Sequence, residues 1–158
     1  MNTRTRHRFP PIDHVAHGVY ISGARAIYEA ATLRNMGLTH VLKLYEDAPF
    51  WPDDFTVCDN ALPDGVFLNL EQLERGVAFV KEQVDSDKTV LVQCGAGISR
   101  SSTFVLAYLV DRGYDLPEAW ELLKAQHEQA NPHPELWRSL ISHYDLPYTL
   151  DDIADWME

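Results

Sequence analysis

The sequence predicts an α/β domain of three layers, with helices flanking a central, mostly parallel sheet. Two observations predict it. Strand-like and helix-like runs alternate along the chain, an order that is typical of a parallel sheet between helices. Residues 89–93 also form a short run that is apolar on both faces, as expected for a central strand of such a sheet. With 158 residues, the chain is long enough to bury the core of one domain.

The first half of the chain provides three predicted strands and two predicted helices. The strands are expected over residues 15–21, 39–45 and 55–58, and the helices over residues 24–36 and 70–84. Gly37 follows the first helix in the position where glycine commonly ends one. In the second helix, apolar residues recur at helical spacing on one face: Leu70, Leu73, Val77, Val80 and Val84.

The second half provides one more strand and three helices. The strand is expected over residues 89–93, and the helices over residues 101–111, 117–130 and 134–144. Proline stands near the start of the last two helices, where its missing N–H costs nothing. We divide the chain into a flexible arm (residues 1–11), a catalytic domain (12–146) and an acidic tail (147–158). The tail has apolar residues at the spacing of a short helix, which we expect to pack back on the domain or onto a second copy.

The loop between strand 89–93 and helix 101–111 has a distinctive chemistry. It begins with the thiol of Cys94 and ends with the guanidinium of Arg100, and we name residues 94–100 the Cys94 loop. Gly95 and Gly97 allow it to curl so that backbone N–H groups point inward at a helix N-terminus, which is an arrangement that binds phosphate. The fork of Arg100 matches two phosphate oxygens, and the positive field favours the nucleophilic thiolate of Cys94. The candidate phosphate-binding residues are therefore Gly95, Ala96, Gly97, Ile98, Ser99 and Arg100.

Three alternative roles for this loop fit the residues less well. A buried strand cysteine is commonly an inert apolar residue, but that does not account for Arg100 or the two glycines. The pair Gly95 and Gly97 begins like a dinucleotide-binding motif, yet Arg100 stands where the third glycine belongs. A Walker loop would need Gly-Lys-Ser/Thr at its end, which is absent. We therefore interpret the loop as a cradle for a tetrahedral oxyanion whose central atom a thiolate attacks.

At these positions the chain resembles the cysteine-dependent protein phosphatases, and most closely the small, single-domain "atypical" dual-specificity phosphatases. Cys94, Gly97, Arg100 and Ser101 fill the motif His-Cys-x2-Gly-x2-Arg-Ser/Thr, and the likeness spans about residues 15–144. The resemblance implies a dual-specificity phosphatase-like fold and metal-independent hydrolysis of phosphotyrosine and phosphoserine/threonine monoesters. It implies a phosphocysteine formed on Cys94, oxygens held by Arg100, and a Ser101 hydroxyl that stabilises the departing thiolate. By itself, Ser101 would be interpreted as a helix cap.

One position departs from the family motif. Gln93 precedes the nucleophile where the family has a histidine that helps to orient the loop and to stabilise the thiolate. Glutamine can donate and accept hydrogen bonds but carries no charge. We expect the fold and the site to be retained, with reduced activity as a real alternative. The extreme form of that alternative is a phosphate-binding pseudophosphatase with weak or no turnover.

The reaction also needs an acid that protonates the leaving oxygen. In the family, this Asp lies on a loop about thirty residues before the cysteine, and Asp64 occupies that position in Leu62-Pro63-Asp64-Gly65. Proline and glycine beside it indicate a turn. Asp59, at the end of the strand over residues 55–58, is the rival candidate. We favour Asp64 over Asp59.

The composition of the chain limits the substrates and binding partners that we expect. The formal net charge of −11 disfavours nucleic acid and anionic membranes. Relatives that act on phosphoinositides carry lysines within the loop, whereas Gly95, Ala96, Ile98 and Ser99 are uncharged. We therefore expect phosphoprotein substrates, with inositol phosphates or another small phosphomonoester as the alternative. We expect a monomer or a weak homo-oligomer, and no metal or other cofactor, because the seven histidines show no spacing typical of zinc ligands.

Cysteine content and the first residues indicate the compartment. Residues 1–11 are polar and basic and do not resemble a signal peptide, and no apolar run reaches the length of a membrane span. Cys58 and Cys94 are the only cysteines, too few for a disulfide scaffold. We expect a reducing, cytoplasmic setting. A reversible disulfide that protects Cys94 is conceivable for Cys58, but a core-facing strand cysteine is the favoured interpretation.

Overall fold

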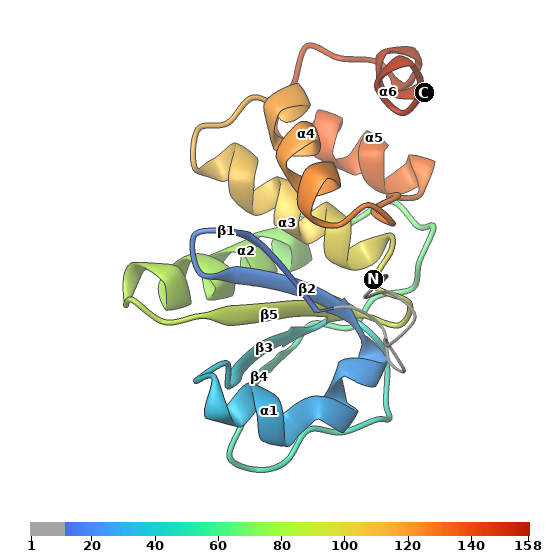
Figure 1. Ribbon diagram of the computed structural model, residues 1–158. Helices are drawn as coiled ribbons and strands as arrows, with labels where there is room; N and C mark the ends of the chain where they lie inside the picture. The colour runs from blue at the N-terminus through green and yellow to red at the C-terminus, as the bar shows by residue number, and fades with distance from the viewer. Residues whose placement is uncertain (1–11) are drawn as a thin grey trace, which may run out of the picture.

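The computed structural model describes residues 12–158 and has the three predicted layers (Figure 1). The arm expected over residues 1–11 lies outside the described residues. The strands are β1 (Asp13–Ala16), β2 (Val19–Gly23), β3 (His40–Lys43), β4 (Thr56–Asp59) and β5 (Val90–Cys94). The helices are η2 (Ala24–Glu29), α1 (Ala30–Asn35), α2 (Leu70–Asp85), α3 (Arg100–Asp111), α4 (Leu116–Gln126), α5 (Pro134–His143) and α6 (Leu150–Trp156). Within residues 12–158, no helix combines the length and the apolar character that crossing a bilayer would require.

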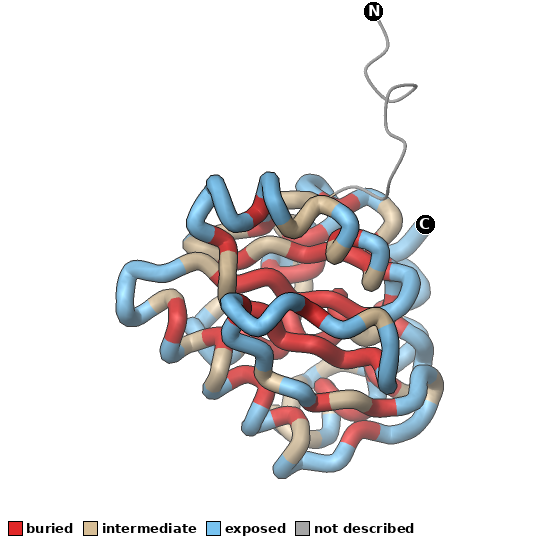
Figure 2. The backbone as a smooth tube through the Cα atoms, turned by 90° about the horizontal axis from the view of Figure 1, so that it is seen from below, coloured by how far each residue is buried: buried red, intermediate tan, exposed pale blue. Residues whose placement is uncertain are grey.

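The sheet has the strand order β1-β2-β5-β3-β4, and only the pair β1–β2 is antiparallel. Successive residues of the central strand β5 face opposite layers. Leu91 points into a small core with α1, whereas Val90 and Val92 point into the larger core beneath α2, α3, α4 and α5. Because both faces of the sheet are covered, the buried residues lie along the central strands in the middle of the molecule (Figure 2). Burial on both faces explains why strand 89–93 is apolar throughout.

The strand predicted over residues 15–21 is wrong in one respect, because this segment is an antiparallel hairpin. The chain turns at His17, whose φ is 54°, and at Gly18. A Cβ on Gly18 would lie 2.6 Å from the carbonyl oxygen of Lys88, so the turn packs directly on the backbone before β5. Buried apolar residues stand at odd positions on both sides of the turn (Val15, Val19 and Ile21), and for this reason the sequence pattern resembles one strand.

The helix predicted over residues 24–36 is also more irregular than expected. Residues 24–29 form the 3-10 helix η2, and regular α-helix covers only residues 30–35. No side chain caps either segment, and the N–H of Ala24 donates to the carbonyl of Gly95 at 3.0 Å. The start of this segment is therefore held by the Cys94 loop and not by a helix cap.

The acidic tail packs on the domain through α6. Thr149 caps this helix together with Asp152, since each side chain accepts a hydrogen bond from the other's backbone N–H. Ile153 is buried, and the Trp156 ring lies edge-on to that of Trp137 on α5, with centroids 6.4 Å apart. The expectation that the tail packs back on its own domain is confirmed.

The contact between α2 and α3 leads to a stability prediction. A Cβ on Gly76 of α2 would overlap the ring of Phe104, which is fully buried on α3. Gly76→Ala should therefore destabilise the fold, because overpacking costs about 1–3 kcal/mol. This exceeds the gain of about 1 kcal/mol that alanine normally brings to a helix. Urea unfolding measures the change.

The matched control is a double-mutant cycle with Phe104→Leu. The smaller side chain makes room for the new methyl group, so the double variant should lose less stability than the sum of the two single variants. Additive losses would contradict the contact.

Candidate active site

The Cys94 loop lies at the carboxyl end of β5, where Cys94 is the last strand residue and Arg100 the first residue of α3. Gly97 sits at the inside of its bend with a φ of 75°, in the left-handed region that favours glycine. A Cβ there would lie 2.6 Å from the backbone nitrogen of Gly23 at the end of β2. The bend therefore presses against the neighbouring strand, and no larger residue fits at position 97.

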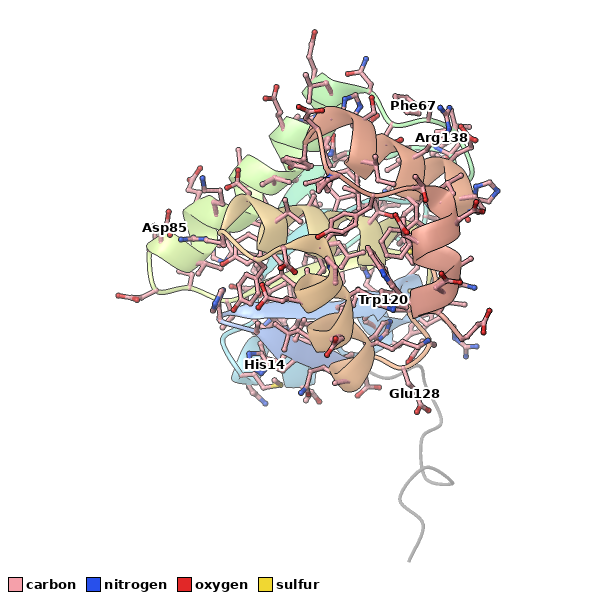
Figure 3. All side chains as sticks on the ribbon, turned by 90° about the horizontal axis from the view of Figure 1, so that it is seen from above. His14, Phe67, Asp85, Trp120, Glu128 and Arg138 are labelled. Atoms are coloured by element: carbon pink, nitrogen blue, oxygen red, sulfur yellow. The ribbon has the colours of Figure 1, made fainter. Side chains whose placement is uncertain are left out.

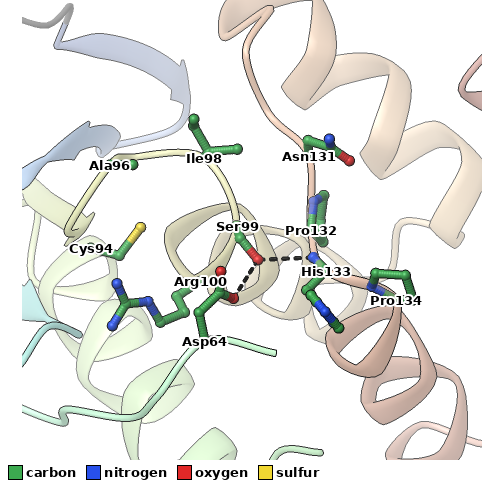
Figure 4. Close-up of a pocket in the computed structure, with 10 residues that line it drawn as sticks. All are labelled: Asp64, Cys94, Ala96, Ile98, Ser99, Arg100, Asn131, Pro132, His133 and Pro134. Atoms are coloured by element: carbon green, nitrogen blue, oxygen red, sulfur yellow. Dashed lines mark hydrogen bonds between the residues drawn. The ribbon is translucent and has the colours of Figure 1, made fainter. Parts of the chain in front are cut away.

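The two ends of the loop lie together. The Cys94 side chain is buried, and its Sγ lies 3.2 Å from the Oγ of Ser101, which is also buried. A Cβ on Gly95 would lie 3.1 Å from Nη2 of Arg100, so the guanidinium curls back to the start of the loop (Figure 4). Its Nη1 donates to the carbonyl of Leu62 at 2.9 Å, which ties the loop to the segment before Asp64.

Ser101 does not cap the helix, contrary to one of its two expected roles. The N-cap of α3 is Ser99, and its side chain makes no capping hydrogen bond either. Ser101 lies inside the first turn, where its hydroxyl is aimed at Cys94. Both serine side chains are thus available to the site, because the helix start uses neither.

Asp64 and Cys94 line the same cleft, which has a volume of about 310 Å³ (Figure 4). The Ser99 hydroxyl donates to Oδ1 of Asp64 at 2.8 Å and accepts from the backbone N–H of His133 at 2.8 Å. Asp59 lies outside this cleft, and its nearest cation is Lys43, with Nζ 3.9 Å from Oδ1. The other residues that line the cleft are Ala96, Ile98, Ser99, Arg100, Asn131, Pro132, His133 and Pro134.

The segment that follows Asp64 is tied to α5. The backbone N–H of Leu68 donates to Oγ of Ser139 at 2.7 Å, and Nε2 of His143 donates to the Leu68 carbonyl at 2.6 Å. Arg138 lies over the ring of Phe67, 5.0 Å from its centroid (Figure 3). The position of the carboxyl therefore depends on a helix seventy residues further along the chain. No local sequence pattern indicates this dependence.

Gln93 occupies the position of the family histidine with its hydrogen bonds satisfied. Its side chain is fully buried, accepts from Nε1 of Trp51 at 2.6 Å and donates to the Gly23 carbonyl at 3.1 Å. It thus connects the end of β5 to the end of β2 and to the segment that follows β3. Sequence reasoning did not find Trp51 as its partner, because the two lie 42 positions apart.

Cys58 is a free cysteine on β4, packed against the larger core, as the favoured interpretation expected. Burial raises the pKa of its thiol above the ordinary value, which disfavours the reactive thiolate. Strand β3 separates β4 from β5, and Cys58 is level with Val92, so at the usual strand spacing the two cysteine backbones are more than about 9 Å apart. A disulfide needs Cα atoms within about 7 Å, and Cys58 therefore cannot protect Cys94 in this arrangement.

The sequence is similar to one family of catalytic domains. The family model described as "Dual specificity phosphatase, catalytic domain" matches residues 19–145. The chain is 31% identical over 135 residues to Dual specificity protein phosphatase PHS1 of Arabidopsis thaliana, covering 81% of this chain but only 14% of that protein. It is 30% identical over 126 residues to Dual specificity protein phosphatase 1B of the same plant, covering 78% of this chain and 75% of that protein.

Solved structures show the same likeness. Human DUSP28 superimposes with a TM-score of 0.78 at 26% identity, covering 87% of this chain and 95% of that one. A mouse protein of this type, solved in complex with zinc tungstate, superimposes with a TM-score of 0.80 at 26% identity. It covers 94% of this chain and 93% of that one. The common fold therefore extends over most of the chain.

The buried amide of Gln93 leads to a second stability prediction. Gln93→Leu leaves the Trp51 N–H unpaired, whereas the Gly23 carbonyl still accepts from the Ser22 hydroxyl at 3.0 Å. We expect a loss of about 1–3 kcal/mol in the free energy of unfolding, which is the cost of one unsatisfied buried group. Urea unfolding measures it. Gln83→Leu is the control. Gln83 is also buried, but within residues 12–158 its side chain makes no hydrogen bond. Equal losses in both variants would contradict the role of the two hydrogen bonds.

Proposed function

Because the chain belongs to the dual specificity phosphatase family, we propose that it hydrolyses phosphotyrosine and phosphoserine/threonine monoesters in proteins. One observation supports this function above the others: the Cys94 thiol, the Arg100 guanidinium and the Asp64 carboxyl line a single cleft at the carboxyl end of the sheet. A nucleophile, an anion clamp and an acid are the three groups that the reaction needs.

The residues then act in two steps. The Cys94 thiolate attacks phosphorus, a sulfur–phosphorus bond forms, and the bond to the leaving oxygen breaks while Asp64 donates its proton to that oxygen. In the second step the Asp64 carboxylate takes a proton from water, which attacks phosphorus and displaces Cys94. The Ser101 hydroxyl, 3.2 Å from Sγ, stabilises the departing thiolate. Arg100 and the loop amides of residues 95–100 hold the three equatorial oxygens throughout.

One neighbouring structure supports the proposal that the domain binds a tetrahedral oxyanion. The mouse relative is described as a complex with zinc tungstate, and tungstate is a tetrahedral oxyanion like phosphate. In this chain the loop starts a helix of twelve residues, whose free N–H groups and dipole favour an anion. We propose that phosphate occupies the cleft with its oxygens toward the amides of the loop.

We further propose phosphoproteins as the substrates, in preference to inositol phosphates. The loop side chains that face the cleft, Ala96, Ile98 and Ser99, offer no positive charge for additional phosphate groups. Residues 12–146 form the proposed catalytic domain, acting as a monomer or weak homo-oligomer. A reducing compartment such as the cytoplasm suits a reaction that needs Cys94 as a free thiol.

The pH–rate profile of aryl phosphate hydrolysis tests this function. The wild type should turn over, and Cys94→Ser should be inactive because it lacks the nucleophile. Asp64→Asn should be slower and should lose the fall in rate at high pH, since that limb reports deprotonation of the acid. A wild type that binds phosphate without turnover would instead indicate the pseudophosphatase. Gln93→His would then show whether the missing histidine is the reason.

A second prediction concerns the hydrogen bond from Ser99 to Asp64. Ser99→Ala should release the carboxyl, and kcat should fall about tenfold or more for phenyl phosphate, a fraction of the 10²–10⁴-fold contribution of a general acid. The fall should be smaller for p-nitrophenyl phosphate, whose leaving group needs less protonation. Steady-state kinetics with both substrates measures the difference.

Ser102→Ala is the control for this variant. Ser102 lies on the same helix, and its buried Oγ has no hydrogen-bond partner within the described chain. We expect its kinetics to match the wild type. An equal fall for both substrates in Ser99→Ala would contradict a role through the leaving group.

A further inference from the structure

His127 is a buried titratable residue that the reaction above does not use. It follows α4, and its side chain is 1% exposed. Its Nδ1 lies 2.6 Å from Oδ2 of Asp13 on β1, and its Nε2 lies 2.6 Å from the carbonyl oxygen of Gly97. One ring thus connects the first strand, the end of α4 and the bend of the Cys94 loop, although no sequence motif includes it.

The partners of the ring determine its protonation. A backbone carbonyl can only accept a hydrogen bond, and so can the ionised carboxylate of Asp13. The His127 ring satisfies both partners only when each nitrogen carries a proton, which is the charged imidazolium. In this arrangement the buried His127 ring, paired with the half-buried Asp13, presents its positive end to the Cys94 loop.

The hydrogen bond to Gly97 also orients the loop. In a trans peptide group the C=O and the following N–H point in opposite directions. A Gly97 carbonyl held toward His127 therefore turns the N–H of Ile98 away from His127, toward the cleft that Ile98 lines and His127 does not.

Two other carbonyls of the loop are held in the same way. The Gly95 carbonyl accepts from the N–H of Ala24 at 3.0 Å, and the Ile98 carbonyl accepts from the N–H of Asn131 at 2.9 Å. Both donors belong to the backbone, so no substitution short of proline removes them. Of these three donors to loop carbonyls, His127 is the one that donates from a side chain, so a substitution can remove its hydrogen bond.

We propose that His127 is a positioning residue for the phosphate-binding loop, with Asp13 orienting its ring. It keeps the Gly97 carbonyl out of the cleft and places a positive charge behind the loop. The inference rests on the proposed function only in taking this loop as the place where the phosphoryl group binds. Neither residue touches the substrate, and their effect passes through the backbone of residues 97–98.

Binding of sodium tungstate to the intact chain, measured by calorimetry, tests this inference. In His127→Leu the Gly97 carbonyl is released, and we expect affinity for tungstate to fall tenfold or more. His127→Gln retains a donor that can reach this carbonyl, and it should recover part of the affinity. Tungstate affinity in His127→Leu equal to that of the wild type would overturn the proposal.

Tyr108→Phe is the matched control. Tyr108 is also fully buried, and its hydroxyl lies 2.9 Å from Nδ1 of His17, two turns along α3 from the Cys94 loop. Its loss should lower stability in urea without weakening tungstate binding. An equal loss of tungstate affinity in both variants would assign the effect to general destabilisation and overturn the positioning role.

A second measurement covers the case in which His127→Leu fails to fold. Nitrogen-15 NMR of the His127 ring in the wild type should show both nitrogens protonated at neutral pH. Asp13→Asn should convert the ring to a neutral form with its proton on Nε2, because the asparagine amide can donate to Nδ1. A neutral ring in the wild type would overturn the charge assignment. Tungstate binding and ring protonation need no turnover, so an inactive wild type would defeat the proposed function and leave this inference standing.

Discussion

The proposed phosphate site depends on one constraint: the backbone N–H groups of the Cys94 loop must face the cleft, which requires that the loop carbonyls be held elsewhere. A peptide chain does not adopt this arrangement unaided, because it crowds like dipoles together. Here the carbonyls on the far side are held by donors from three separate parts of the chain, the start of η2, the end of α4 and the segment before α5. The bend at Gly97 fits because β2 ends directly beneath it.

The Asp64 carboxyl is positioned by a different set of contacts. Asp64 lies on an exposed turn, and its carboxyl is directed by Ser99 of the loop that it serves. Ser99 in turn accepts from the backbone of His133, where α5 begins. The Cys94 loop, the Asp64 carboxyl and the start of α5 are thus linked through one hydroxyl. A shift of α5 would therefore affect both the loop and the carboxyl.

Gln93 shows how a departure from the family motif can be accommodated. The amide oxygen accepts from Trp51 and the amide nitrogen donates to Gly23, so both polar atoms of the buried side chain have a partner. This accounts for a retained loop geometry in the absence of the family histidine. The charge that a histidine could carry at this position is absent, and the structure places another histidine, His127 paired with Asp13, behind the loop.

The sequence by itself determined the α/β class, the central strand over residues 89–93 and the grouping of Cys94, Arg100 and Ser101, because all of these depend on neighbours along the chain. The local pattern gave a wrong prediction at residues 15–21, where evenly spaced apolar residues lie on both sides of a turn, and at residues 24–36, where the chain is held by the Cys94 loop. Only the tertiary structure decided that Asp64 and not Asp59 shares the cleft with Cys94, and that His127 supports Gly97. The physical reason is that hydrogen bonds between segments thirty or more residues apart depend on how the layers pack, and such packing leaves no periodic trace in the sequence.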